Sequence, residues 1–476
     1  MERSATPGRR RGARRCRWAL ATGLLTALLS PASIQAQDDE PSTYAGSLWS
    51  RPRLSGDWLG LRDQMAARGV TVDLDLLQIM QGVGTGGRGT GVEYGGSAHY
   101  ALNVDTAKLG LWPGGALNVY AMTGYGNNVD RMAGGIVPVN YNGVLPEPNE
   151  SVTALMNLTY TQMFSSWFGV YLGKIDTVDG DSNEFADNYK TKFMNEGLAC
   201  DFVNAMVPVS AWGGGVILQP SDGALFSAGV LDPNGSPTDN SLDHAFANGV
   251  MVTGQGRVTV KPFGLVGHQF LTFTWSDMER LSLQQDPGNL ARLLADFRFP
   301  RLENPGPVLL RILERFFPEL LVPAKPLNEK PNTWAVLYNF DQYLWSPQGD
   351  PNRGIGIFFR FGVTDGNPNP FKYGYSAGIG GKGVVPGRRE DTFGIGWFRV
   401  DFSSELVPFL RQALKLGLGH EDVVELYYNA AVTPWLHVTA DLQVVDPGLK
   451  KTLGAGGRLE NVDTAVIGGL RVYTRF

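Results

Sequence analysis

The most constraining feature of this sequence is an alternation of apolar and polar residues that returns along most of its length. The stretch WLHVTADLQVV, residues 435–445, is a clear example. One set of alternate positions is apolar, namely Leu436, Val438, Ala440, Leu442 and Val444. The intervening positions include His437, Thr439, Asp441 and Gln443. A period of two predicts a β-strand with one apolar and one polar face.

The same pattern recurs often enough to predict an all-β chain. Glycine supplies 61 of the 476 residues, which suits many short strands and turns, and charged residues are only 18%, below the typical value of about 25%. We predict sixteen strands, at residues 71–80, 98–108, 116–124, 151–162, 168–176, 211–219, 223–231, 248–260, 267–276, 333–341, 353–363, 372–380, 391–402, 421–432, 435–445 and 464–476.

The lengths of the connections between these strands alternate as well. They are short after the second, fourth, sixth and fourteenth strands and long after the first, third, fifth, seventh, ninth, thirteenth and fifteenth. A soluble β-sandwich also alternates apolar and polar positions, but it has no reason to separate short from long connections. We therefore predict a 16-stranded antiparallel transmembrane β-barrel with short periplasmic turns, long external loops and a few short helices. Such a barrel has no unpaired edge and encloses a water-filled lumen.

The barrel is expected to follow two shorter segments. Residues 1–36 have the basic stretch, apolar run and small residues of a signal peptide. Residues 37–70 form a polar segment with a short helix, and residues 71–476 form the barrel. The long external loop 277–332 contains two predicted helices, 289–297 and 307–321, which cap the rim, plug the pore or bind a partner.

Charge and cysteine content limit the functions open to the chain. Residues 1–36 carry seven Arg and one Glu, so 34 basic and 45 acidic residues follow, a net charge of −11. This balance argues against nucleic acid as a partner. Cys200 is then the single cysteine, so neither an intrachain disulfide nor a thiolate metal cluster is expected. We found no catalytic motif in a suitable context, and we expect no enzyme activity, no cofactor and no metal.

Several segments resemble the carbohydrate-selective porin (OprB) family of Gram-negative outer membranes. They are LSGDWLGLRDQMAARGV (54–70), GKIDTVDGDSNEFADN (173–188), FFRFGVTDGNPNP (358–370), GIGGKGVVPGRREDTFGIGW (378–397) and ELYYNAAVTPWLHVTADLQVVDPG (425–448). The resemblance implies a barrel surrounded by outer-membrane lipid, through which small neutral sugars such as glucose diffuse passively. The resemblance does not decide the oligomeric state, which is a monomer or a homotrimer. The alternatives are a general diffusion porin without sugar preference and, from another class, an exported soluble lectin or glycosidase.

The segment after the fifth strand would be the third external loop, which commonly folds into the lumen of porins and narrows it. Fixed charges and hydrogen-bonding groups there would set selectivity. An ordinary solvated loop and a cation site are the other readings of its acidic residues. The candidate constriction residues are Lys174, Asp176, Asp179, Asp181, Asn183 and Glu184.

Strand alternation also predicts which side chains line the lumen. The arginines of strands 353–363, 391–402 and 464–476 could face the acidic loop across the pore, although charges inside a wide barrel can also simply pair with one another. The predicted pore-lining residues are Asp73, Asp75, Arg360, Arg399, Asp401, Glu425, His437, Asp441, Gln443, Arg471 and Arg475.

Overall fold

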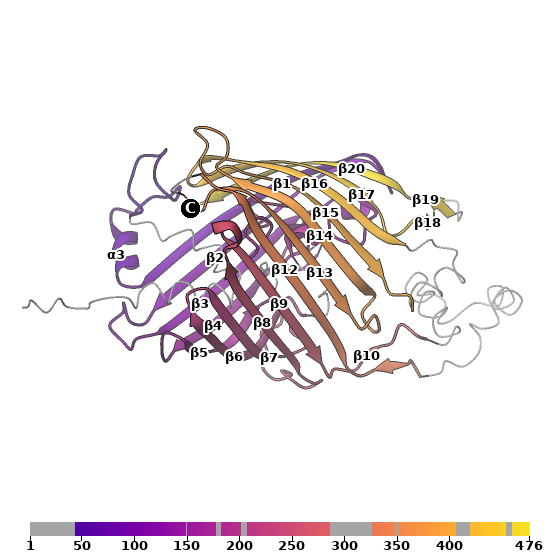
Figure 1. The fold of residues 1–476 in the computed structure, drawn as a ribbon, viewed down its shortest axis with the longest axis horizontal. Helices are drawn as coiled ribbons and strands as arrows, with labels where there is room; N and C mark the ends of the chain where they lie inside the picture. The colour runs from indigo at the N-terminus through magenta and orange to yellow at the C-terminus, as the bar shows by residue number, and fades with distance from the viewer. Residues whose placement is uncertain are drawn as a thin grey trace, which may run out of the picture.

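The chain forms a closed barrel of sixteen antiparallel strands (Figure 1). The computed structural model describes residues 43–148, 150–177, 182–200, 207–285, 326–347, 350, 352–405, 419–453 and 459–476. The predicted signal peptide and the two helices predicted at 289–297 and 307–321 lie outside these residues. In the described parts of the chain, no helix is long and apolar enough to cross a membrane.

The sixteen predicted strands are all confirmed as barrel strands. They are β1 (Val70–Gly87), β2 (Gly91–Asp105), β3 (Gly115–Gly126), β4 (Thr153–Met163), β5 (Phe168–Asp176), β6 (Ser210–Ser221), β7 (Ala224–Leu231), β8 (Met251–Val260), β9 (Gly267–Ser276), β12 (Thr333–Trp345), β13 (Gly354–Thr364), β14 (Phe371–Lys382), β15 (Thr392–Phe402), β16 (His420–Thr433), β17 (Leu436–Asp446) and β20 (Asp463–Arg475).

Each strand pairs with its neighbours in sequence, and β1 closes the ring by pairing with β20 through contacts such as Asp75 with Arg475. Closure leaves no edge strand whose backbone groups would meet hydrocarbon unpaired. Two short two-stranded sheets lie outside the ring, β10 (Arg280–Leu281) with β11 (Glu329–Lys330) and β18 (Lys451–Leu453) with β19 (Leu459–Asn461).

The two ends of the barrel differ in their connections. At the end where β1 begins and β20 finishes, seven turns of two to nine residues join the strands. Six of the eight connections at the other end are longer than fifteen residues. We call the first end periplasmic and the second external, because bacterial outer-membrane barrels place their short turns in the periplasm.

One predicted long loop is wrong. The connection after the first strand is a turn of three residues, 88–90, because β1 continues to Gly87 and β2 begins at Gly91. Backbone pairing continues through this stretch, with Gln81 opposite Glu93 and Val83 opposite Gly91. The many glycines between residues 82 and 96 hide the alternation of apolar and polar residues in the sequence, but their backbone groups can still pair.

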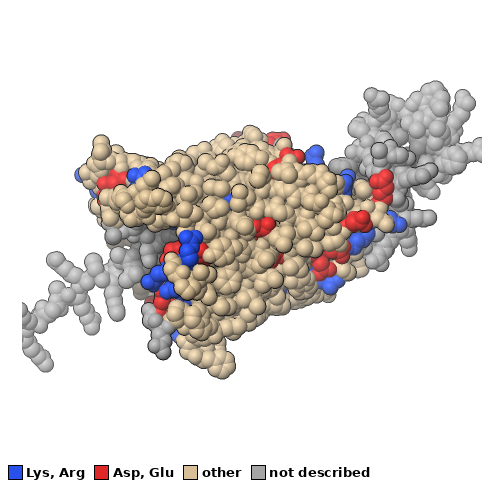
Figure 2. All heavy atoms as spheres, turned by 90° about the horizontal axis from the view of Figure 1, so that it is seen from above, with Lys and Arg blue, Asp and Glu red and all other residues tan. Residues whose placement is uncertain are grey.

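The outer wall carries the apolar face of the strands. Residues such as Leu271 on β9, Leu426 on β16 and Leu442 on β17 are 46–56% exposed, although they are large and apolar. The face seen in Figure 2 is mostly uncharged between the two ends of the barrel. An apolar outer band of this kind is what a lipid environment requires of a transmembrane barrel.

The segment before β1 is packed against the periplasmic end. Its helix, α3 (Leu61–Ala67), follows Asp57, whose carboxylate accepts the backbone N–H of Asp63 at 2.9 Å. Asp73 on β1 binds two guanidinium groups from this segment, those of Arg53 at 2.8 Å and Arg62 at 2.9 Å. The segment is therefore fixed to the inside of the barrel mouth.

Candidate functional site

The loop between β5 and β6 enters the lumen and follows the wall opposite its own strands. Its described part, residues 182–200, includes the short helix α5 (Glu196–Ala199). The side-chain amide of Asn183 donates to Asn339 Oδ1 on β12 at 2.7 Å, and the backbone N–H of Glu184 donates to Asp341 Oδ2 at 3.1 Å. Because Asn339 lies near the middle of β12, the 182–200 loop crosses the lumen at about half its height.

Arg471 on β20 holds the middle of the 182–200 loop. Its guanidinium donates to the carbonyl oxygens of Tyr189 and Lys192, both at 2.6 Å, and to Thr439 Oγ1 at 3.0 Å. The Arg471 side chain is fully buried. Its charge therefore satisfies loop backbone rather than facing open water, as buried backbone carbonyls require.

Two further wall residues hold the end of the same loop. The carboxylate of Glu425 on β16 accepts the backbone N–H groups of Met194 at 2.5 Å and Asn195 at 3.0 Å. Arg360 on β13 donates to the carbonyl oxygen of Leu198 at 2.8 Å. The barrel wall thus offers donors to loop carbonyls and an acceptor to loop N–H groups.

A second loop, residues 127–148 between β3 and β4, also packs inside the barrel. It contains α4 (Asp130–Ala133) and the 3-10 helix η1 (Tyr141–Val144). Glu421 on β16 accepts the N–H groups of Ile136 and Val137, each at 2.8 Å, and the Gln443 amide donates to the carbonyl of Val139 at 2.9 Å. No pattern in the sequence predicted that this loop turns inward.

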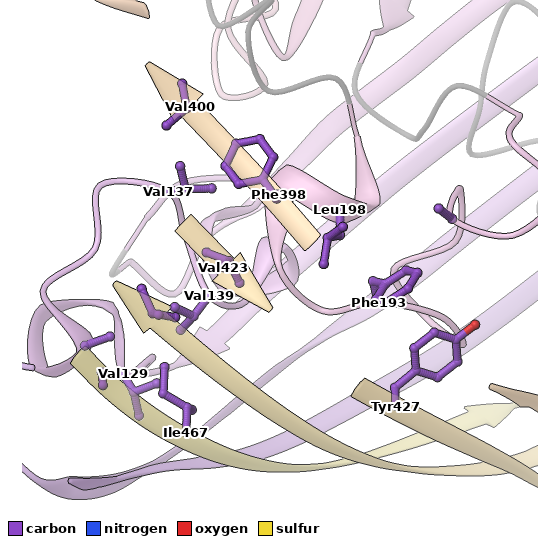
Figure 3. Close-up of a cluster of buried hydrophobic side chains, with 14 of the residues drawn as sticks. Val129, Val137, Val139, Phe193, Leu198, Phe398, Val400, Val423, Tyr427 and Ile467 are labelled. Carbon is purple, nitrogen blue, oxygen red and sulfur yellow. The ribbon is translucent and has the colours of Figure 1, made fainter. Parts of the chain in front are cut away.

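The two loops form a buried hydrophobic core with one side of the inner wall (Figure 3). Val137 and Val139 of the 127–148 loop and Phe193 and Leu198 of the 182–200 loop are at most 1% exposed. Their wall partners, also buried, are Phe398, Val400, Val423, Tyr427 and Ile467. Part of the lumen is therefore filled by apolar packing, and solutes must use the remaining space.

This core overturns the predicted orientation of two residues. Phe398 and Val400 on β15 point into it, and neighbouring positions on a strand face opposite sides. Arg399 and Asp401 therefore face outward, paired with each other at 3.4 Å. The prediction assumed that polar residues face the lumen, and it failed where the loops make the lumen apolar.

The predicted constriction residues are divided among several places. Lys174 is fully buried, and its ammonium binds the loop between β7 and β8, through the carbonyl of Asp239 at 2.8 Å and Asn240 Oδ1 at 2.6 Å. Asp176 is 2% exposed at the end of β5. Asn183 and Glu184 anchor the 182–200 loop, as described above. Asp179 and Asp181 lie outside the described residues.

Charged groups of the 182–200 loop form a compact network beside β12. Lys192 Nζ lies 2.5 Å from Asp187 Oδ1 and donates to the Glu184 carbonyl at 2.6 Å, while Tyr343 donates its hydroxyl to Glu184 Oε1 at 2.8 Å. Burial raises the pKa of Glu184. Burial alone would lower the pKa of Lys192, but Asp187 and Glu184 raise it. Lys192 was not among the residues predicted from the sequence, because NYKTKF (188–193) shows only a weak polar alternation.

Most of the other predicted pore-lining residues face the lumen side of the wall and have partners there. Asp75 accepts the Tyr473 hydroxyl at 2.8 Å and lies 3.8 Å from Lys190 Nζ. Asp441 accepts the Gln443 amide at 3.0 Å. Their contact with solute stays a prediction.

A cavity of about 980 Å³ lies between the 182–200 loop and the periplasmic ends of β12, β14–β17 and β20. His437 and Arg475, both predicted to line the pore, border it. So do aromatic rings, those of Trp49, Phe185, Tyr343, Tyr427 and Tyr473. Its charged lining includes Arg53, Glu184, Asp187, Lys192, Asp350, Arg353, Lys382, Arg388, Arg389, Glu390 and Asp391.

Comparison with known proteins gave three consistent results. Residues 90–476 match the model of the family described as "Carbohydrate-selective porin, OprB family". Porin B of Pseudomonas aeruginosa is 26% identical over 166 residues, which cover 32% of this chain and only about a third, 34%, of Porin B. The structure of Pseudomonas putida OprB at high pH superimposes with a TM-score of 0.72 at 20% identity, covering 90% of this chain and 100% of that one.

Proposed function

Because the chain belongs to the carbohydrate-selective porin, OprB family, we propose that it lets small, glucose-like sugars diffuse passively through its lumen. It is a β-barrel of the Gram-negative outer membrane, and its family and fold are those of a channel. Passive diffusion follows the gradient of the solute. The proposal therefore requires neither a nucleotide nor a cofactor.

The observation that carries the sugar assignment is the lining of the 980 Å³ cavity. Its volume lies within the range of small-molecule sites, roughly 300–1,000 Å³. Carboxylates, amides and guanidinium groups can exchange hydrogen bonds with sugar hydroxyls, and aromatic rings can cover apolar faces of a pyranose. The cavity offers both kinds of group, because Trp49 and Tyr427 line it together with Asn188 and Arg475.

We place the selective contacts on the periplasmic face of the 182–200 loop. Glu184, Asp187 and Lys192 border the cavity from this side, and His437 and Arg475 border it from the wall. In this scheme Arg360, Glu425, Gln443 and Arg471 act on solutes indirectly, because their polar groups hold the loops that shape the passage.

Liposome swelling tests the proposal against its nearest alternative. We expect glucose to enter faster than a disaccharide and far faster than its size alone predicts, and glucose to block ion conductance in a planar bilayer at saturable concentrations. A general diffusion porin would instead give rates that follow solute size, with no saturable block. That outcome would contradict the proposed preference for sugars, but it would still agree with a channel function.

A charge-neutralising variant tests the role of the acidic loop. The triple substitution Asp179→Asn, Asp181→Asn and Glu184→Gln should change the ratio of cation to anion permeability. A matched control, with Asp222→Asn, Asp243→Asn and Glu279→Gln, removes the same charge from exposed sites. Equal reversal potentials in the two variants would mean that the acidic residues of this loop do not set the selectivity of the channel.

A further inference from the structure

A cluster of polar side chains stands on the outer wall at the external ends of β15, β16 and β17. On β16, Glu421 and Val423 face the lumen, so the alternate residues His420 and Asp422 face outward. Asp446 is the partner of Asp422 across the β16–β17 ladder. We call His420, Asp422 and Asp446 the outer-rim triad. Its side chains face away from the lumenal loops described above.

The triad brings three ligand atoms of the kinds that bind divalent metal ions close together. One nitrogen of His420 and one oxygen each of Asp422 and Asp446 all lie within 4.8 Å of one another, and His420 Nε2 is 3.2 Å from Asp422 Oδ2. Bonds of about 2.0–2.1 Å in a tetrahedral zinc site put ligand atoms about 3.3 Å apart. The three half-exposed side chains can close the remaining distance by small rotations.

One hydrogen-bond donor and one ammonium group contact the two carboxylates. Trp397 donates its indole N–H to Asp422 Oδ1 at 3.0 Å, and Lys450 Nζ lies 2.8 Å from Asp446 Oδ1. The second oxygen of Asp422, Oδ2, faces His420 Nε2 at 3.2 Å and lies 3.7 Å from Arg399 Nη2. Such outer partners fix the direction of metal-binding carboxylates in known sites. The strands carrying the triad are neighbours in a closed ladder, which provides a rigid support.

The local charge favours a cation. Asp401, Asp422 and Asp446 face two cationic groups, those of Arg399 and Lys450, so one negative charge is uncompensated when His420 is neutral. An imidazole with two carboxylates favours a transition metal over magnesium or calcium, which prefer oxygen ligands alone. The single histidine is therefore what separates the triad from an ordinary acidic surface.

We propose that the outer-rim triad binds one divalent transition metal ion of the zinc type through His420, Asp422 and Asp446, with water completing its coordination. The bound ion would link the external ends of β16 and β17. Binding of this ion should not affect the passage of sugars, because the triad lies on the outer side of the barrel wall and the sugars pass on the inner side.

Calorimetric titration of the purified, tag-free barrel in detergent with Zn²⁺ tests this assignment. We expect one saturable site per chain, at least tenfold weaker binding in His420→Ala and in Asp446→Asn, and unchanged binding in His244→Ala. His244 is an exposed histidine on the loop between β7 and β8, so it reports adventitious binding to a surface imidazole. Heat-modifiable migration on gels shows that each variant is a folded barrel.

Two results would overturn the proposal. One is the absence of saturable Zn²⁺ binding to the folded wild-type barrel. The other is a stoichiometric site that His420→Ala leaves intact, which would place the ion elsewhere. Glucose block of conductance should be the same with and without Zn²⁺, so failure of the metal site leaves the proposed sugar channel untouched.

Discussion

Replacing Arg471 with methionine should loosen the 182–200 loop and widen the pore. The methionine side chain fills much of the same space but donates no hydrogen bond. Arg471 donates to the carbonyl oxygens of Tyr189 and Lys192, both at 2.6 Å, from a fully buried position. The variant therefore leaves two loop carbonyls without their charged donor.

The size of the effect follows from these two contacts. A hydrogen bond to a charged group contributes about 1.5–3 kcal/mol, so together they contribute about 3–6 kcal/mol to holding this part of the loop. Each 1.4 kcal/mol is a factor of ten in an equilibrium, and the ratio of held to released loop should fall by roughly 10² to 10⁴. Glu425 and Arg360 still hold the end of the loop, so we expect local release rather than complete detachment.

Single-channel recording in planar bilayers measures this release. We expect a larger open conductance or frequent transitions to a larger level, together with weaker block by glucose. Arg399→Met is the matched control, since it removes an arginine that faces outward and pairs with Asp401. Its conductance and glucose block should equal those of the wild type.

A folded Arg471→Met barrel with wild-type conductance, current noise and glucose block would refute the reasoning. It would mean that the hydrophobic core and the other wall anchors fix the loop without the guanidinium. Loss of heat-modifiable migration would show instead that the barrel had failed to form, and Arg471→Lys, which keeps a charged donor, would then be recorded in its place.

Three further predictions concern pH, the N-terminal segment and one strand. Burial raises the pKa of Asp130 to about 7 and that of Glu196 to about 8. Both values lie above those of the unfolded chain, about 4, so their stabilising contribution is full below pH 4 and is lost as pH rises through 7–8. Asp130 and Glu196 lie in the two loops that enter the lumen, so these loops should be held less firmly at high pH. The noise of the single-channel current should therefore be greater at pH 9 than at pH 6. Equal noise at the two pH values would contradict this. Asp73→Asn should weaken the contacts of two arginines and expose the segment before β1 to trypsin; equal cleavage of wild type and variant would argue otherwise. Gly173→Ala should lower the urea midpoint of the barrel, because φ is 143° and the new methyl carbon would lie 2.0 Å from a backbone oxygen. Gly89→Ala, in open space, should leave the midpoint unchanged, and equal midpoints in both variants would count against the argument.

The sequence by itself determined that the chain forms a barrel, and it determined for most strands which side chains face the lumen. A period of two is visible wherever one face meets lipid and the other meets polar groups. Short turns at one end and long loops at the other are the pattern of outer-membrane barrels, and this pattern is also visible in the sequence. His437, Asp441 and Gln443 on β17 lie on the lumen side, as the alternation of WLHVTADLQVV predicts. Such local signals require no knowledge of distant segments.

Tertiary structure alone decided what fills the lumen. The inward turn of the 127–148 and 182–200 loops depends on partners far away in sequence, such as Glu421, which binds Val137 across 284 positions. Those loops make part of the inner wall apolar, and so Phe398 turned inward and Arg399 outward against the expected rule. Whether a polar residue faces the lumen depends on whether its surroundings in the lumen are polar. Loop packing sets that polarity, and the sequence of a single strand does not show how the loops pack.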